Sequence, residues 1–140
     1  MDFTIHPVSW HDAEPLLRSV REAVFMREQG VPAELEWDGL DETCEHVLAL
    51  SNAGLAIGCG RILPNAHIGR IAVLPEWRGK KVGTAVLQGL LAYAASRHYP
   101  EVDIDAQVQA LPFYERLGFV AEGEVFMDAG IPHRKMRLTL

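Results

Sequence analysis

Short segments in which apolar and polar residues alternate are separated along this chain by segments in which apolar residues recur at helical spacing. Alternation with a period of two predicts two strands after residue 119, around a Gly-Ile-Pro turn, and five earlier ones at residues 3–8, 46–51, 55–63, 67–74 and 101–108. Apolar residues three and four apart predict helices at about residues 9–29, 81–99 and 110–118. The order β-α-β-β-β-α-β-α-β-β predicts a mixed α/β domain.

The first predicted helix has clear start and stop signals. Ser9 can cap its N-terminus, and Gly30 and Pro32 end it. The stretch that follows, residues 32–46, is acidic and rich in turn formers. It predicts an irregular surface loop with a short helical turn.

Composition narrows the class of protein without naming a function. The 140 residues are enough for a single domain over 1–140 with a sizeable core. The net charge of −6 argues against a nucleic-acid partner, and the absence of a long apolar run argues against a membrane partner. Two cysteines do not make a disulfide framework, and the first ten residues do not resemble a secretory signal. We therefore expect a cytoplasmic protein.

The stretch AVLPEWRGKKVGTAVL, residues 72–87, concentrates cations and glycines where a strand gives way to a helix. The first turn of a helix has unpaired N–H groups and the positive end of the helix dipole. Glycines in the preceding loop let backbone amides approach an anion closely, and Arg78, Lys80 and Lys81 add charge. The pattern predicts a site for a phosphate-bearing ligand, although a plain basic helix start with a tight turn explains it as well.

A second stretch, ALPFYERLGF at residues 110–119, decides between these interpretations. Together the two stretches resemble the GNAT N-acetyltransferase superfamily, and REAVFMREQGVPAELEWDGLDE with GEVFMDAGIPHRKM resembles its ElaA-like branch. The resemblance implies the acyl-CoA N-acyltransferase fold, with a central mixed, mostly antiparallel sheet flanked by helices. It implies an N-acetyltransferase that moves an acetyl group from acetyl-CoA to a primary amine of a small molecule or peptide, directly within a ternary complex.

The resemblance also assigns cofactor-binding residues. The loop would hold the pyrophosphate of acetyl-CoA, and the preceding strand would pair with the pantetheine arm. The residues implied are Ile71, Ala72, Val73, Arg78, Gly79, Lys80, Lys81, Val82, Gly83, Thr84, Phe113 and Tyr114. The family loop often has glycine where this chain has Lys81, so only the backbone amide of Lys81 can replace that contact.

Catalytic roles follow from the same resemblance and from acetyl-transfer chemistry. Tyr114 is predicted to be the general acid that protonates the leaving thiolate, and its alternative role is packing of the short helix. The N–H of Ala72 or Val73 is a candidate for polarising the thioester carbonyl. His67 and His133 are candidates for the base that an ammonium acceptor needs near pH 7. By period two, His67 should share a strand face with Gly69, Ile71 and Val73.

The acceptor site is predicted less directly. Glu28, Asp41 and His46 match the ElaA-like pattern in the region that lines the acceptor pocket in GNAT proteins, and each also has a structural interpretation. Arg21 is expected to pair with one of these carboxylates as part of the scaffold. A thiol route through Cys44 and His46, two residues apart, is a further alternative.

Two other functions stay open. One is a non-catalytic acyl-CoA-binding sensor or scaffold protein, and the other is an anion-binding domain for a ligand such as a nucleotide. No histidine or cysteine spacing typical of a metal site is present, so no metal is expected. GNAT proteins commonly dimerise, which makes a homodimer one expectation, although no heptad pattern marks an interface.

Overall fold

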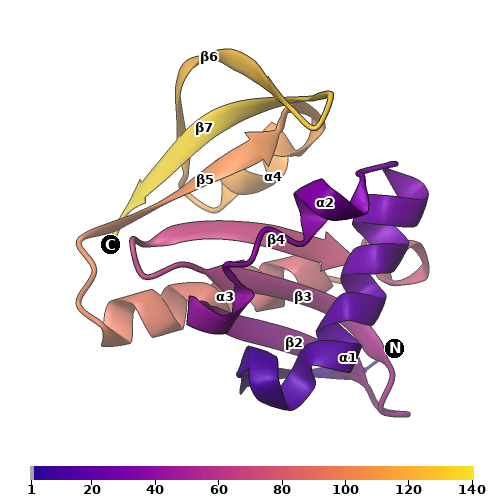
Figure 1. Ribbon diagram of the computed structural model, residues 1–140. Coiled ribbons are helices and arrows are strands. Elements are labelled where there is room, and N and C mark those ends of the chain that lie inside the picture. The colour runs from indigo at the N-terminus through magenta and orange to yellow at the C-terminus, as the bar shows by residue number, and fades with distance from the viewer. Residues whose placement is uncertain (1) are drawn as a thin grey trace.

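The alternating segments of the sequence form one seven-stranded sheet in a computed structural model that describes residues 2–140 (Figure 1). The strands are β1 (Phe3–Val8), β2 (Glu45–Ser51), β3 (Ala56–Ile62), β4 (His67–Val73), β5 (Glu101–Gln107), β6 (Val120–Asp128) and β7 (Ile131–Thr139). The helices are α1 (Trp10–Arg21), its π-helical continuation η1 (Glu22–Glu28), α2 (Ala33–Glu36), α3 (Val82–Ser96) and α4 (Leu111–Arg116). Single 3₁₀ turns are η2 (Asp41–Thr43), η3 (Pro75–Trp77) and η4 (Val108–Ala110).

Strand order and pairing confirm the expected fold class. The order across the sheet is β1-β2-β3-β4-β5-β7-β6, and the β4–β5 pair is parallel while its neighbours are antiparallel. The parallel pair is joined through α3, which is the crossover that such a pair requires. The result is a mixed, mostly antiparallel sheet flanked by helices, and the predicted order of elements is correct.

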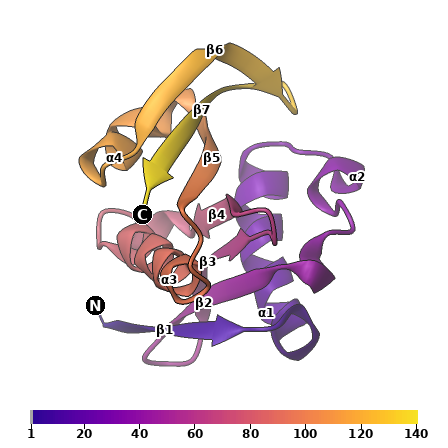
Figure 2. The same cartoon turned by 90° about the vertical axis from the view of Figure 1, so that its left-hand side faces the viewer.

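The helices α1 and α3 lie on opposite faces of the sheet (Figure 2), and an apolar cluster lies on each face. On one face α1 and η1 pack through Leu17, Val20 and Val24 against side chains of β2, β3 and β4. On the other face α3 is buried along Val86, Leu87 and Leu90. The helical spacing seen in the sequence therefore marks the buried stripe of each helix, except that Leu16 is largely exposed.

Two glycines in β3 explain how closely α3 approaches the sheet. A Cβ added at Gly60 would lie 2.9 Å from both Val86 Cγ1 and Leu90 Cδ1, and one at Gly58 would lie 2.9 Å from Val82 Cγ1. These distances are shorter than real Cβ contacts, so side chains at these positions would push the helix away. The glycines of GCGR thus mark a close approach of helix and sheet.

The stretch between η1 and β2 was predicted to be a surface loop, and this prediction is wrong for two of its acidic residues. Glu36 and Asp41 are buried, because both accept hydrogen bonds from the buried guanidinium of Arg21, at 2.8 and 2.5 Å. Arg61 of β3 donates to Asp38 and Asp41 from the other side, at 2.5 and 2.9 Å. We call these five residues the arginine network; it fastens the stretch to the sheet.

Membrane insertion through a helix is not indicated by the fold. Across residues 2–140, none of the helices combines the length and the apolar character needed to cross a bilayer.

Candidate active site

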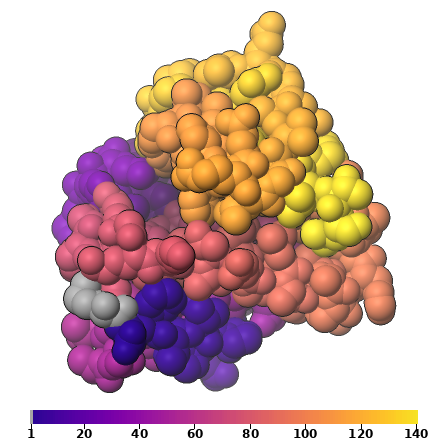
Figure 3. Space-filling model, turned by 180° about the vertical axis from the view of Figure 1, so that it is seen from behind, coloured from indigo at the N-terminus to yellow at the C-terminus, as the bar shows by residue number. Residues whose placement is uncertain are grey.

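The β4–β5 pair opens into a cavity because the first two residues of β4 pair with the middle of β5 and the strands do not pair beyond them. His67 lies opposite Asp103 and Ile68 opposite Ile104, and no further pairs follow. Beyond them the strands diverge, and a cavity of about 880 Å³ lies between and beside them. Seen from behind, α4, β6 and β7 form one lobe of the surface and the β4–α3 region forms the lobe below it (Figure 3).

The N-terminus of α3 borders this cavity with backbone N–H groups that have no helical partner. Ala85 donates the first helical hydrogen bond, to Lys81, so the amides of Val82, Gly83 and Thr84 precede it, and no side chain caps them. Lys81 has a φ of 68°, in the left-handed region where glycine is usual. This explains the departure of Lys81 from the family pattern: the backbone conformation that a glycine would give is kept.

The predicted cofactor-binding residues gather here with one exception. The cavity is lined by Ile71, Ala72, Val73, Arg78, Gly79, Lys81, Val82, Gly83, Thr84, Phe113 and Tyr114, but not by Lys80. A Cβ at Gly83 would meet only Phe113 and Val73, each at 3.7 Å. The space above the first turn of α3 is therefore open, as an anion held by these amides would require.

Arg78 is held by a carboxylate that lies far away in the sequence. Its guanidinium donates to both oxygens of Glu28, at 2.6 and 2.7 Å, and its Nε donates to the carbonyl of Val73. The hydrogen bond from Arg78 lowers the pKa of Glu28. Glu28 is thus bound to the predicted anion loop.

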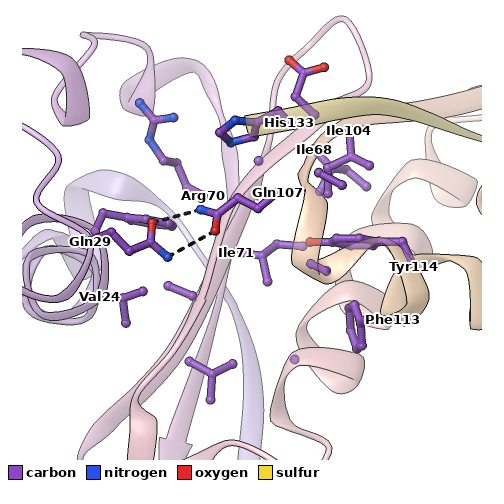
Figure 4. Close-up of a pocket in the computed structure, with 18 of the residues that line it drawn as sticks. Val24, Gln29, Ile68, Arg70, Ile71, Ile104, Gln107, Phe113, Tyr114 and His133 are labelled. Carbon is purple, nitrogen blue, oxygen red and sulfur yellow. Dashed lines mark hydrogen bonds between the residues drawn. The ribbon is translucent and has the colours of Figure 1, made fainter. Parts of the chain in front are cut away.

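Tyr114 lies on the opposite wall of the cavity from β4. Its ring packs edge-on between Phe113 and Phe119, with centroids 5.0 and 5.7 Å away. The hydroxyl points into the cavity toward Ile71 and has no hydrogen-bond partner among residues 2–140 (Figure 4). Burial raises the pKa of the phenol, which keeps its proton in place. A side chain that is fixed by packing, with a free hydroxyl in a cavity, suits a proton donor.

A bulge at Arg70 overturns the prediction that His67 shares a face with Ile71 and Val73. Between the pairs Cys59–Ala72 and Arg61–Gly69, β4 has one residue more than β3, and Arg70 has a φ of 53°. An extra residue shifts the alternation. His67 consequently faces Asp103 on the polar side of the sheet, whereas Ile71 and Val73 pack with the α3 cluster.

The polar side of the cavity holds both predicted histidines and a pair of glutamines. Gln107 at the end of β5 and Gln29 after η1 hydrogen-bond each other across the cavity, at 2.9 Å (Figure 4). His133, opposite Gln107 on β7, donates through Nδ1 to the carbonyl of Ile131 and stacks on Phe126. His67 is hydrogen-bonded through Nδ1 to Asp103.

Asp41 and His46 were predicted at the acceptor pocket, and the structure corrects this. Both are buried away from the cavity, Asp41 between two arginines of the network and His46 with its Nε2 donating to the Asp41 carbonyl. Burial lowers the pKa of His46. The predicted pairing of Arg21 with one of the carboxylates is confirmed by its bond to Asp41.

The thiol route through Cys44 has no support in the geometry. Cys44 is buried, burial raises the pKa of its thiol, and it does not line the cavity. Cys59 is a core residue, as expected. No group of three or more metal-ligating side chains occurs within residues 2–140.

Sequence reasoning missed several polar residues that line the cavity, among them Gln29, Arg70, Asp105 and Gln107. For Asp105 and Gln107, the sequence pattern could have predicted their place. In EVDIDAQV the polar residues Asp103, Asp105 and Gln107 alternate with apolar ones, which puts them on one face of β5. That face proves to be the polar side of the cavity.

Three comparisons with known proteins agree with this geometry. A family described as Acetyltransferase (GNAT) domain matches residues 15–140. The uncharacterized N-acetyltransferase YjcF of Bacillus subtilis (strain 168) is 39% identical, over 84% of this chain and 86% of its own.

Two solved structures have a similar fold. That of Escherichia coli ElaA superposes with a TM-score of 0.82 at 29% identity, over 98% of this chain and 99% of the other. An acyl-CoA N-acyltransferase from Pseudomonas aeruginosa has a TM-score of 0.78 at 30% identity, over 97% of each chain.

Proposed function

Since this chain belongs to the GNAT acetyltransferase family, in its ElaA-like branch, we propose that it is an acetyl-CoA-dependent N-acetyltransferase. The family supports acyl transfer from acyl-CoA. The finer proposal is that residues 1–140 form one domain that moves acetyl from acetyl-CoA to a primary amine of a small molecule or peptide. Transfer is direct, within a ternary complex, and no residue carries the acetyl group.

One observation carries this proposal: a single cavity connects the free amides at the start of α3 with the free hydroxyl of Tyr114. The amides of Val82, Gly83 and Thr84 suit a pyrophosphate, because they combine unpaired donors with the positive end of the helix dipole. The cavity edge of β4, from Ile71 to Val73, has no β5 partner and is free to pair with an extended pantetheine arm.

The proposed chemistry uses three parts of the chain. The N–H of Ala72 or Val73 polarises the thioester carbonyl and stabilises the negative charge that develops on its oxygen. Tyr114 gives its proton to the departing thiolate. Acetyl-CoA supplies the activated acetyl group, and the polar side of the cavity accepts the amine.

Thermal unfolding with and without acetyl-CoA tests the proposal. A ligand at a hundred times its Kd adds about 2.7 kcal/mol to the free energy of unfolding, which raises the Tm of a chain of this size by roughly 10 °C. The increase should be lost in Gly83→Glu, which brings a carboxylate to the anion site, and largely kept in the matched neutral variant Gly83→Gln. No increase with the wild type would contradict the proposal.

Release of free thiol from acetyl-CoA with a panel of primary amines then separates an enzyme from a non-catalytic acyl-CoA sensor. Stabilisation together with thiol release that depends on an amine supports the transferase. Stabilisation without release for any amine supports the sensor.

A further inference from the structure

Three side chains at the point where β4 and β5 diverge form an arrangement that the proposed function leaves unused. His67 is the first residue of β4, Asp103 lies opposite it on β5, and Asp105 is two residues further along the same face of β5. On the basis of the proposed function, we infer that His67 is the base that deprotonates the acceptor amine, with Asp103 as its positioning residue. Asp105 binds the amine as its ammonium ion.

The ring of His67 is oriented by its contact with Asp103. Nδ1 of His67 is hydrogen-bonded to Oδ1 of Asp103, and a carboxylate only accepts. The Nδ1 atom must therefore carry the hydrogen. In the neutral ring the other nitrogen, Nε2, then has a lone pair and accepts hydrogen bonds. Asp103 fixes the tautomer of His67, as the carboxylate beside a catalytic histidine does in other enzymes.

The lone pair of Nε2 faces a second carboxylate. Nε2 lies 3.7 Å from Oδ2 of Asp105, too far for a direct hydrogen bond. Oδ2 of Asp105 and Nε2 of His67 thus face each other as two hydrogen-bond acceptors without a donor between them. The other oxygen of this carboxylate, Oδ1, is buried and has no hydrogen-bond partner among residues 2–140.

A primary ammonium ion is the chemical group that completes this arrangement. It has three N–H donors and a positive charge, so that one nitrogen can donate to both Asp105 and Nε2 of His67. A carboxylate with one buried, unpaired oxygen is unfavourable, and a cation bound at its other oxygen stabilises the charge of the carboxylate. The geometry therefore favours acceptors that enter as cations over neutral amines and alcohols.

The other candidate bases are occupied. Glu28 is bound by both terminal nitrogens of Arg78, and Glu36, Asp38 and Asp41 are bound by arginines of the network. His133 has no carboxylate partner; its Nδ1 donates to a backbone carbonyl, and its ring lies against Phe126. His67 alone among these groups combines an orienting carboxylate with a free nitrogen.

Several other charges surround the site and set its electrostatics. Lys135, opposite Asp105 on β7, makes no ion pair with it in the described chain, and its charge acts on Glu122. The titratable and charged side chains on the same side of the cavity or on the neighbouring strands are Glu36, Asp38, Arg70, Asp103, Asp105, Asp128, His133, Lys135 and Arg137.

The proton and electron pairs balance as follows. The ammonium gives one proton to Nε2 of His67, and the freed electron pair on nitrogen forms the C–N bond with the acetyl carbon. The C–S bond breaks, its electron pair stays on sulfur, and Tyr114 gives a proton to that sulfur. Tyr114 regains a proton from the acylated nitrogen, and His67 releases its proton to solvent. The products are the amide, the thiol of CoA and one proton.

The test that does not require a known acceptor is the state of the His67 ring. Nitrogen-15 NMR of the histidine side chains at neutral pH should show His67 with hydrogen on Nδ1 only, and His67→Gln assigns the signal. Titration with methylammonium should shift the Nε2 resonance of His67, whereas tetramethylammonium, which has no N–H donor, should not. The exposed residues His11 and His98 serve as internal controls.

Two isosteric variants separate the roles. Asp103→Asn should lose the single tautomer, because an amide both donates and accepts. Asp105→Asn should keep the tautomer and lose the response to methylammonium. Once an acceptor is found, Asp105→Asn should raise its KM by roughly tenfold to hundredfold, and His67→Gln should lower kcat by roughly hundredfold.

A wild-type ring with hydrogen on both nitrogens, or on Nε2 alone, would overturn the inference, and so would a response to methylammonium that survives in Asp105→Asn. Failure of the proposed function is recognised separately. In that case acetyl-CoA does not raise the Tm of the wild type, whatever the histidine spectrum shows.

Discussion

The arginine network and the cavity contain similar side chains and use them in opposite ways. In the network, each of the carboxylates of Glu36, Asp38 and Asp41 accepts a hydrogen bond from Arg21 or Arg61. In the cavity, the Tyr114 hydroxyl, an oxygen of Asp105 and the first amides of α3 have no partner among residues 2–140. Paired charges fasten the stretch between η1 and β2 to the sheet, and unpaired polar groups mark the proposed ligand site.

Breaking the network should give the largest effect on stability. Arg21→Met removes one of the two arginines that pair with Glu36 and one of the two that pair with Asp41, and removal of one partner from a buried ion pair costs about 3–5 kcal/mol. Chemical denaturation measures the loss in the free energy of unfolding. The control is Glu14→Gln, which breaks the exposed pair with Arg18 and should cost less than about 1 kcal/mol. Equal losses of unfolding free energy in both variants would show that the buried ion pairs of the network matter no more for stability than an exposed one.

Tyr114→Phe should show the reverse behaviour in the cavity. The ring keeps its packing against Phe113 and Phe119, and removal of a hydroxyl without a partner strands no other group, so the Tm should not fall. Thiol release from acetyl-CoA should slow by roughly hundredfold, as expected for loss of a general acid. Unchanged turnover with an active amine would exclude Tyr114 as the acid.

Asp38 gives the network a signature in its pH dependence. Burial opposes ionisation of Asp38, but hydrogen bonds from Arg61 and from the Leu40 amide outweigh it, and its pKa falls from 3.8 to about 2. A folded-state pKa below the unfolded one means that the stabilisation is present above about pH 4 and is lost as the pH falls toward 2. Asp38 is partly exposed, so solvent screens its charge, and Asp38→Asn should lower the free energy of unfolding by roughly 1 kcal/mol at pH 7. The difference from wild type should shrink toward pH 2; a difference independent of pH would contradict this account.

The smallest effect on the free energy of unfolding is expected at the Glu28–Arg78 ion pair, which lies next to the proposed anion site. Glu28 and Arg78 are both about 40% exposed, so Glu28→Gln should change the free energy of unfolding by less than about 1 kcal/mol. It should also free Arg78 for the anion site and lower the Kd for CoA, as measured by calorimetry. A higher Kd would show that Glu28 holds Arg78 in its binding position.

The comparison also explains what the sequence could predict. The order of elements and the basic loop before α3 were predictable, because each depends on residues close together in the chain, whereas Tyr114 was singled out by the family resemblance. The acidic stretch was misjudged, since a carboxylate pairs with an arginine 20 residues away and the composition of the stretch does not reveal this. Asp41 was assigned to the acceptor pocket for that reason.

The bulge at Arg70 shows a second limit. One extra residue in β4 leaves the apolar pattern of the strand intact. Residues before and after the bulge that would otherwise share a face nevertheless point to opposite faces of the sheet. The prediction therefore placed His67 on the right strand but wrongly on the same face as Ile71 and Val73. Only the pairing with β3 reveals the bulge, and that pairing is not encoded locally.

The short pairing of β4 with β5 also has a mechanical consequence. It divides the sheet into two parts, β1 to β4 and β5, β7 and β6. These two parts are joined by only two residue pairs and share one apolar cluster. Two residue pairs give few hydrogen bonds, so the angle between the two parts is set mainly by the apolar cluster that they share.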